Sequence, residues 1–212
     1  MINPSIVYLW GFKPQEASSP PKETIYNNRN YIDKYVIIDP HIALDLVKDF
    51  GLYDLYQMIP DQAWVVKTDL VRILYVYYYG QIYLDLDCKI RKNFVDDFRE
   101  HEVLLFKESF LWNTRMLGER EMKIRLRVSN YAFASKVIQH PFFKIALDEA
   151  SKRLHQLLVV EKKTNFSQKD ILWVCGPDVF STIYHLRKND FPTVRLLPKN
   201  HIKHMRHGAW RN

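Results

Sequence analysis

Glycine and cysteine are both scarce in this sequence of 212 residues, which contains six glycines and two cysteines. So few glycines exclude a glycine-rich repeat architecture, and no internal repeat or low-complexity tract is present. Cys88 and Cys175 form no CxxC pair, so the sequence indicates neither a disulfide framework nor a thiolate zinc site. A reducing compartment is the simpler interpretation, and we expect a cytoplasmic location.

Long apolar runs are also missing. Residues 1–12 have neither the basic start nor the apolar core of a signal peptide. The longest apolar stretch, residues 70–80, carries an arginine and is too short to cross a bilayer. We therefore expect no membrane span. We also expect residues 1–212 to form a single domain, taken from a longer chain because the sequence ends abruptly.

The residues that are abundant favour a folded domain. Hydrophobic residues make up 47% of the chain and aromatic residues 14%, which excludes a disordered protein. The formal net charge of +7 is compatible with nucleic acid, an acidic membrane or a phosphorylated small ligand as a partner. The basic residues do not form one long block, so an ordinary solvated surface remains the alternative.

Predicted strands and helices alternate along the chain. The sequence predicts strands at residues 5–11, 35–39, 80–90, 101–108, 125–135 and 193–198. It predicts helices at residues 23–33, 40–50, 61–80, 140–158 and 175–188. This alternation indicates an α/β fold in which helices flank a mostly parallel central sheet.

The predicted helix at residues 61–80 precedes the strand of greatest interest. Its buried face follows the i, i+3, i+4, i+7 spacing at Leu70, Ile73, Leu74 and Tyr77. We expect Asp61 to cap this helix and Gly80 to end it. Asp69 and Arg72, three residues apart, form either an ordinary surface pair or a pair that faces the carboxyl end of the next strand, where α/β proteins bind ligands.

The stretch GQIYLDLDCKI, residues 80–90, is predicted to be one strand with alternating faces. Tyr83, Asp85 and Asp87 fall on one face. The other face is apolar and carries Ile82, Leu84, Leu86 and Cys88. Two carboxylates side by side suit a hard divalent cation, whose open positions would take phosphate oxygens. The alternative is a solvent-exposed strand end with two ordinary acids.

Residues 67–87, KTDLVRILYVYYYGQIYLDLD, resemble an ordered pattern, SDxxRxxxLxxxGGxYxDxD. It is typical of the DXD sugar-nucleotide glycosyltransferases, in particular the family 32 sugar transferases and the glucosylating bacterial toxins. Weaker similarities to the same families are found at residues 5–11, 128–135, 140–143, 175–180 and 204–210.

The resemblance implies a GT-A fold and a metal-dependent transferase that moves sugar from a nucleotide-sugar donor, with UDP as the expected nucleotide, to a glycan acceptor. It further implies Mn²⁺ or Mg²⁺ as cofactor, retention of anomeric configuration and no nucleic-acid partner. The implied catalytic residues are Asp69, Arg72, Asn130 and Asp178. The implied donor-binding residues are Trp10, Gly11, Asp69, Arg72, Asp85, His207 and Trp210. The implied metal ligands are Asp85, Asp87 and His204.

This sequence departs from the family pattern at two positions. Gln81 replaces the second glycine before the strand, so we expect that turn to differ. Ala209 replaces a serine whose hydroxyl would face metal or phosphate, which gives more weight to His204 and His207. The alternative for residues 201–212 is a basic tail with no fixed structure.

Two other classes of protein remain open. A haloacid-dehalogenase-like phosphatase also carries a DxDxT motif after an apolar strand, but Lys89 stands here at the fifth position. A non-catalytic module that binds nucleic acid or glycan would fit the positive charge and the many tyrosines. Metal-dependent release of UDP would distinguish the transferase from both.

Overall fold

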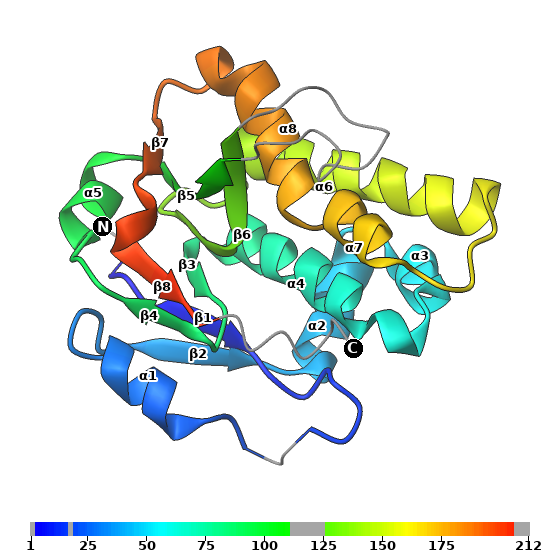
Figure 1. The fold of residues 1–212 in the computed structure, drawn as a ribbon, viewed down its shortest axis with the longest axis horizontal. Coiled ribbons are helices and arrows are strands. Elements are labelled where there is room, and N and C mark those ends of the chain that lie inside the picture. Colours follow the sequence, from blue (N-terminus) through cyan, green and yellow to red (C-terminus); the bar gives the residue numbers. More distant parts are fainter. Residues whose placement is uncertain (1–2, 17–18, 111–125, 206–212) are drawn as a thin grey trace.

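The computed structural model describes residues 3–16, 19–110 and 126–205, in which helices and strands alternate along the chain (Figure 1). The strands are β1 (Ile6–Leu9), β2 (Tyr35–Ile38), β3 (Gln81–Leu84), β4 (Cys88–Ile90), β5 (Val103–Phe110), β6 (Leu126–Ser135), β7 (Val194–Leu197) and β8 (Ile202–His204). The helices are α1 (Lys22–Asn28), α2 (Pro40–Asp49), α3 (Tyr53–Met58), α4 (Trp64–Tyr79), α5 (Val95–Glu100), α6 (Pro141–His155), α7 (Gln168–Val174) and α8 (Pro177–Arg187). None of these helices combines the length and the apolar composition that crossing a bilayer requires.

The central sheet has six strands in the order β2-β1-β3-β6-β5-β7. β1 runs parallel to β2 and β3, and β5 runs parallel to β7. β6 alone is reversed, because it pairs antiparallel with both β3 and β5. The sheet is therefore mostly parallel, and the predicted α/β class is confirmed.

Both faces of the central sheet are covered, as a parallel sheet requires. Val7 and Leu9 of β1 face a core to which α2, α4, α6 and α8 contribute. Ile6 and Tyr8, which alternate with them, face a second core formed with α1, α5, β4 and β8. Figure 1 shows the larger helical layer on one side of the sheet and the smaller layer on the other.

α4 is the central helix of the larger layer. Leu70, Ile73 and Leu74 are fully buried, as the spacing predicted. Gly80 ends the helix with φ of 71°, also as expected. The predicted cap is wrong: Asp61 opens a short 3₁₀ turn, and no side chain caps α4 itself. Asp61 is instead paired with Lys67, with 2.9 Å between the carboxylate and the ammonium.

The single strand predicted at residues 80–90 is wrong. β3 ends at Leu84, and the Cys88 N–H closes a turn by donating to the Asp85 carbonyl at 2.9 Å. After that turn the chain leaves the central sheet and β4 pairs with β8, with Cys88 opposite His204. Asp85 and Asp87 therefore do not share a strand face. Apolar and polar residues continue to alternate across this turn, so the sequence pattern does not show where the strand ends.

The turn before β3 keeps a backbone conformation that favours glycine. Gln81 has φ of 83°, in the left-handed region that costs a residue with a side chain about 1 kcal/mol or more. Its side-chain oxygen accepts a hydrogen bond from the Ser5 N–H at 2.8 Å, which ties the turn to the start of β1. This contact offsets part of the strain that the missing glycine introduces.

Shorter elements account for most of the other differences from the sequence prediction. The helix predicted at residues 23–33 ends at Asn28, and α3, α5 and α7 were not predicted. Residues 202–204 form β8, so this part of the C-terminal segment is ordered in a sheet. Residues 206–212 lie outside the described part of the chain.

Candidate active site

A cavity of about 430 Å³ lies at the carboxyl ends of β1 and β3, the edge where α/β sheets usually bind ligands. Its walls come from β1, α1, α4, β3 and the turn after it, β5, β6, α7, α8 and β8. Among the residues that line it are Trp10, Asp69, Arg72, Asp85, Asp87, Asn130 and His204. The resemblance to the DXD glycosyltransferases implied a role for each of these residues.

Arg72 joins three of those residues. One guanidinium nitrogen lies 2.6 Å from the Asp69 carboxylate, and another lies 3.0 Å from the Asp85 carboxylate and donates to the Asn130 carbonyl at 2.8 Å. The Asn130 amide donates back to Asp69 at 3.1 Å. Asp69 and Arg72 are 3% and 5% exposed, so the surface-pair alternative is wrong. The pair faces the end of the strand, as the other interpretation predicted.

Burial shifts the carboxylates of this network toward neutrality. It raises the pKa of Asp69 to about 7, although the charge of Arg72 opposes the rise. Burial also raises the pKa of Asp85, again against Arg72 and with a contribution from the charge of Asp87. Arg72 is therefore the charge that most favours the ionised form of both carboxylates, although burial outweighs it. One Asp85 oxygen is occupied by Arg72 and the Tyr83 hydroxyl.

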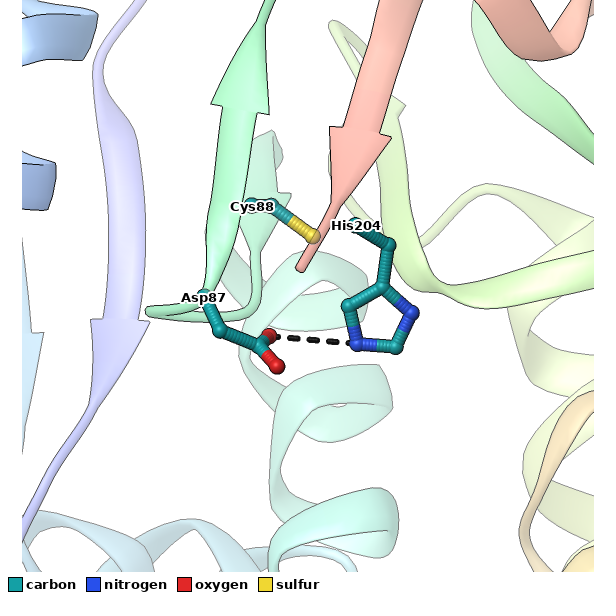
Figure 2. Close-up of side chains that lie close together, drawn as sticks. All are labelled: Asp87, Cys88 and His204. Carbon is teal, nitrogen blue, oxygen red and sulfur yellow. Dashed lines mark ion pairs between the residues drawn. The ribbon is translucent and has the colours of Figure 1, made fainter. Parts of the chain in front are cut away.

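Asp87 and His204 form the second cluster of the cavity. Figure 2 shows the Asp87 carboxylate facing the ring of His204, with 3.1 Å between oxygen and Nε2. The Met205 N–H donates to the Asp87 carbonyl at 2.8 Å, which fixes the end of β8 beside the turn. The ring of His204 lies against Tyr131, with 4.4 Å between ring centroids.

Asp87, Cys88 and His204 place one potential ligand atom each within 4.8 Å of one another. Burial raises the pKa of the Cys88 thiol well above its usual value, so it stays protonated, and it donates to the Tyr131 carbonyl. A hard cation such as Mg²⁺ or Mn²⁺ prefers oxygen ligands and is poorly served by a protonated thiol. The Asp87 carboxylate therefore fits either ion, and the neutral imidazole of His204 offers a nitrogen ligand beside it. Asp85 can contribute only the oxygen that Arg72 leaves available, or a bridging water.

Protons and cations compete for His204. Burial by itself would lower the pKa of this imidazole, but the hydrogen bond to Asp87 and the nearby charges of Asp85, Asp87 and Glu108 raise it overall. A metal ion requires the neutral ring and must displace this proton. Metal affinity is therefore expected to rise with pH through the neutral range.

The cavity is acidic, although the chain as a whole is basic. Among the lining residues that the structure describes, Arg72 and His204 are the only basic side chains. Six carboxylates line it: Glu16, Glu23, Asp69, Asp85, Asp87 and Glu108. Such a lining repels an anionic ligand unless a cation enters with it.

Asn28 of α1 supports the turn from behind. It is fully buried, and its amide donates to the Cys88 carbonyl at 2.9 Å and to the Tyr8 hydroxyl at 3.0 Å. Its side-chain oxygen accepts the Ile90 N–H at 2.9 Å. These bonds hold β4 against α1 and β1, and so position Asp87, which directly precedes β4.

Two of the other residues implied by the resemblance do not line the cavity. Gly11 follows Trp10 with φ of 86° and is exposed, and it does not line the cavity. Asp178 is 1% exposed in the first turn of α8, accepts a hydrogen bond from Arg127 at 2.7 Å and is not among the lining residues. His207 and Trp210 lie outside the described residues.

Several lining residues were not predicted from the sequence. Tyr131 could have been found, since it directly follows Asn130 in the motif and its ring supports His204. Trp64 lies four positions before Thr68 on α4, but an aromatic at the start of a helix usually belongs to the core. Glu108 lies near the end of β5, where nothing in the surrounding sequence marks it.

The fold resembles that of known glycosyltransferases. PaToxG Glycosyltransferase superposes with a TM-score of 0.56 at 17% identity, over 89% of this chain and 71% of its own. The apo form of mouse Xyloside xylosyltransferase 1 has a TM-score of 0.39 at 13% identity, over 77% and 62%, which is too low to support an argument. No family model and no curated protein matches the sequence. At such low identity the first likeness shows the fold alone: this chain has a glycosyltransferase fold of the GT-A type.

Proposed function

We propose that the protein is a metal-dependent glycosyltransferase that uses a nucleotide-sugar donor, with UDP as the nucleotide, and a glycan acceptor. The observation that carries this proposal is the convergence of Asp69, Arg72, Asn130, Asp85 and Asp87 on one cavity at the strand ends. Asp69, Arg72, Asp85 and Asp87 come from one stretch of about twenty residues, whereas Asn130 comes from β6, and the DXD resemblance implied a role for each of them.

The two halves of the cavity would have different tasks. Trp10, at the end of β1, would stack on the uracil ring. Asp69, Arg72 and Asn130 would orient the donor by hydrogen bonds to its sugar hydroxyls and phosphate. Because Arg72 already holds Asp69 and Asp85 in place, these groups need little rearrangement when the donor binds.

Asp87 and His204 would hold the metal ion, and Asp85 would assist through its second oxygen or a water. When bound, Mn²⁺ or Mg²⁺ supplies positive charge that stabilises the leaving diphosphate. The acidic lining supports this assignment, because a diphosphate would otherwise be repelled. Retention of anomeric configuration comes from the resemblance and remains part of the proposal.

The phosphatase alternative is less consistent with the geometry. Such an enzyme needs a free carboxylate oxygen on the first aspartate of its motif to attack phosphorus. Here Arg72 and Tyr83 both contact the same Asp85 oxygen, so a single oxygen is left both to attack phosphorus and to contact a metal ion. Lys89 at the fifth position of the motif belongs to β4 and pairs with Lys203.

The proposal is tested by donor turnover. Wild-type protein is incubated with UDP-glucose, UDP-galactose, UDP-xylose or UDP-N-acetylglucosamine, and UDP release is measured with Mn²⁺ and with EDTA. We expect release from at least one donor with Mn²⁺, a loss of release in EDTA, and recovery when Mn²⁺ is restored. Equal turnover in EDTA and in Mn²⁺ would show that the reaction does not depend on a metal ion. Release of phosphate instead of UDP would favour the phosphatase.

Trp10→Ala should weaken Mn²⁺-supported UDP binding about ten- to a hundredfold, the range for loss of one base–aromatic stack. Titration calorimetry of the folded variant measures this. Trp173→Ala is the matched control, because Trp173 packs against Arg153 and does not line the cavity. A larger loss of UDP affinity in Trp64→Ala would indicate that the base stacks on Trp64, the other tryptophan of the cavity. Unchanged UDP affinity in all three variants would refute stacking.

A further inference from the structure

Glu108 occupies an irregular point in the central sheet. On β5, Lys107 is opposite Val128 and Ser109 is opposite Arg127, so Glu108 is an extra residue inserted between two consecutive partners on β6. Such a bulge redirects a side chain and is frequent beside active sites. Here it accompanies the placement of the Glu108 carboxylate on the cavity wall.

The Glu108 carboxylate is incompletely satisfied. Its Oε2 atom is buried and has no hydrogen-bond partner among the described residues, and the same is true of Arg127 Nε. The two atoms are 3.7 Å apart, close enough for an ion pair but too far for a hydrogen bond. Arg127 is anchored on its other side by Asp178 at 2.7 Å, which restrains it from closing the gap.

An ionised carboxylate can only accept hydrogen bonds, and leaving a buried one without a donor is unfavourable. Because Oε2 is screened from solvent beside Arg127, the other oxygen of this carboxylate is the one that a ligand in the cavity can reach, and the side chain as a whole is 19% exposed. A ligand hydroxyl that donates to that oxygen would partly satisfy the carboxylate. The position of Glu108 indicates which part of the ligand carries the hydroxyl. Trp10 follows β1 and Glu108 lies on β5. Because β3 and β6 lie between β1 and β5 in the sheet, these two strands are three strand spacings, or about 14 Å, apart.

A nucleotide sugar bound with its base at Trp10 and its diphosphate beside Asp87 would extend its sugar toward β6 and β5. We propose that Glu108 accepts a hydrogen bond from a hydroxyl of that sugar and thereby helps to select the donor. This inference rests on the proposed function, since it assumes a nucleotide-sugar donor in the cavity. The inference assigns a positioning role to Arg127 and Asp178, because Arg127 is paired with the Glu108 carboxylate and is itself anchored by Asp178.

The test compares UDP with UDP-sugars. In Glu108→Gln, the Kd for UDP with Mn²⁺ is expected to stay within about twofold of wild type, because UDP lacks the sugar. The Kd for the best wild-type donor among the four UDP-sugars named above is expected to rise about ten- to a hundredfold, the range for a hydrogen bond to a charged group. Glu108→Asp keeps the charge beside Arg127 but shortens the side chain, and it should show the same selective loss if the glutamine variant folds poorly.

Glu102→Gln is the matched control, because it removes a carboxylate just before the start of β5, where Glu102 bonds Thr193 and His140 outside the cavity. It should leave both Kd values unchanged. If Glu108→Gln lowers the melting temperature but keeps the wild-type ratio of the two Kd values, Glu108 is only the partner of Arg127 and the inference is wrong. If wild-type protein binds neither UDP nor any UDP-sugar with Mn²⁺, the proposed function itself fails.

Discussion

Replacing Asp87 by asparagine is expected to reduce Mn²⁺-supported UDP release about a hundredfold or more, while the protein stays folded. The amide keeps the size of the carboxylate but removes the charge that would hold the metal, and metal stabilisation of a leaving group is worth several kcal/mol. Steady-state turnover over a range of Mn²⁺ concentrations measures the effect. Asp96→Asn is a suitable control, because Asp96 pairs with Arg99 on the exposed surface. Wild-type turnover in Asp87→Asn would mean that the turn carries ordinary surface acids.

The same variant has a pH-dependent effect on stability in the absence of metal. The partner Asp87 helps to raise the pKa of His204 in the folded protein above its value in the unfolded chain. The stability from this pair is therefore fully present below the unfolded pKa of about 6.5 and is lost as pH rises through the folded pKa. Asp87→Asn should lower the melting temperature more at pH 6 than at pH 9. An equal fall in melting temperature at pH 6 and at pH 9 would show that Asp87 does not raise the pKa of His204.

Arg72→Ala is expected to cause the largest loss of stability. The substitution leaves Asp69 and Asp85 without their shared cation, and breaking a buried ion pair costs about 3–5 kcal/mol. For a domain of this size the melting temperature should fall by about 6–20 °C. Arg99→Ala is the matched control: it breaks an Arg–Asp pair with the same i, i+3 spacing on the surface, and its effect should be below about 1 kcal/mol.

The loss in Arg72→Ala should also depend on pH. Without the guanidinium, the pKa of both buried carboxylates rises further above the unfolded value of about 3.9. Between that value and the raised pKa the folded protein binds more protons than the unfolded chain, so the variant becomes more stable as pH falls. Its deficit relative to wild type should therefore shrink from pH 8 to pH 5. A deficit under 1 kcal/mol, or one that does not change with pH, would contradict the central role of Arg72.

The sequence predicted the order of the large elements because their signals are local. Alternating apolar runs marked the strands, Gly80 marked the end of α4, and the spacing of Leu70, Ile73 and Leu74 marked its buried face. Short elements such as β8 were missed, since three residues carry too little periodicity to distinguish a strand from a loop. The break after Leu84 was missed because the apolar alternation continues through the turn.

The candidate site was predictable only where a motif defines it. Asp69, Arg72, Asp85 and Asp87 fall within one ordered pattern of about twenty residues, and the structure brings them to one cavity. Glu108 could not be predicted, because its position depends on a bulge between two strands, and strand register is a property of the folded sheet. The same reasoning applies to Asn28, whose support of β4 depends on a contact 60 residues away.

Metal dependence of UDP binding tests the central claim most directly. Thermal unfolding of the wild-type protein is followed with UDP alone, with Mn²⁺ alone and with both. UDP at one hundred times its Kd, with Mn²⁺ present, should stabilise the fold by about 2.7 kcal/mol and raise the melting temperature by roughly 5–10 °C. UDP without metal should produce little or no shift, because the acidic lining of the cavity repels the diphosphate. An equal shift in EDTA, or no shift with Mn²⁺ and UDP together, would contradict a metal-dependent nucleotide-sugar site.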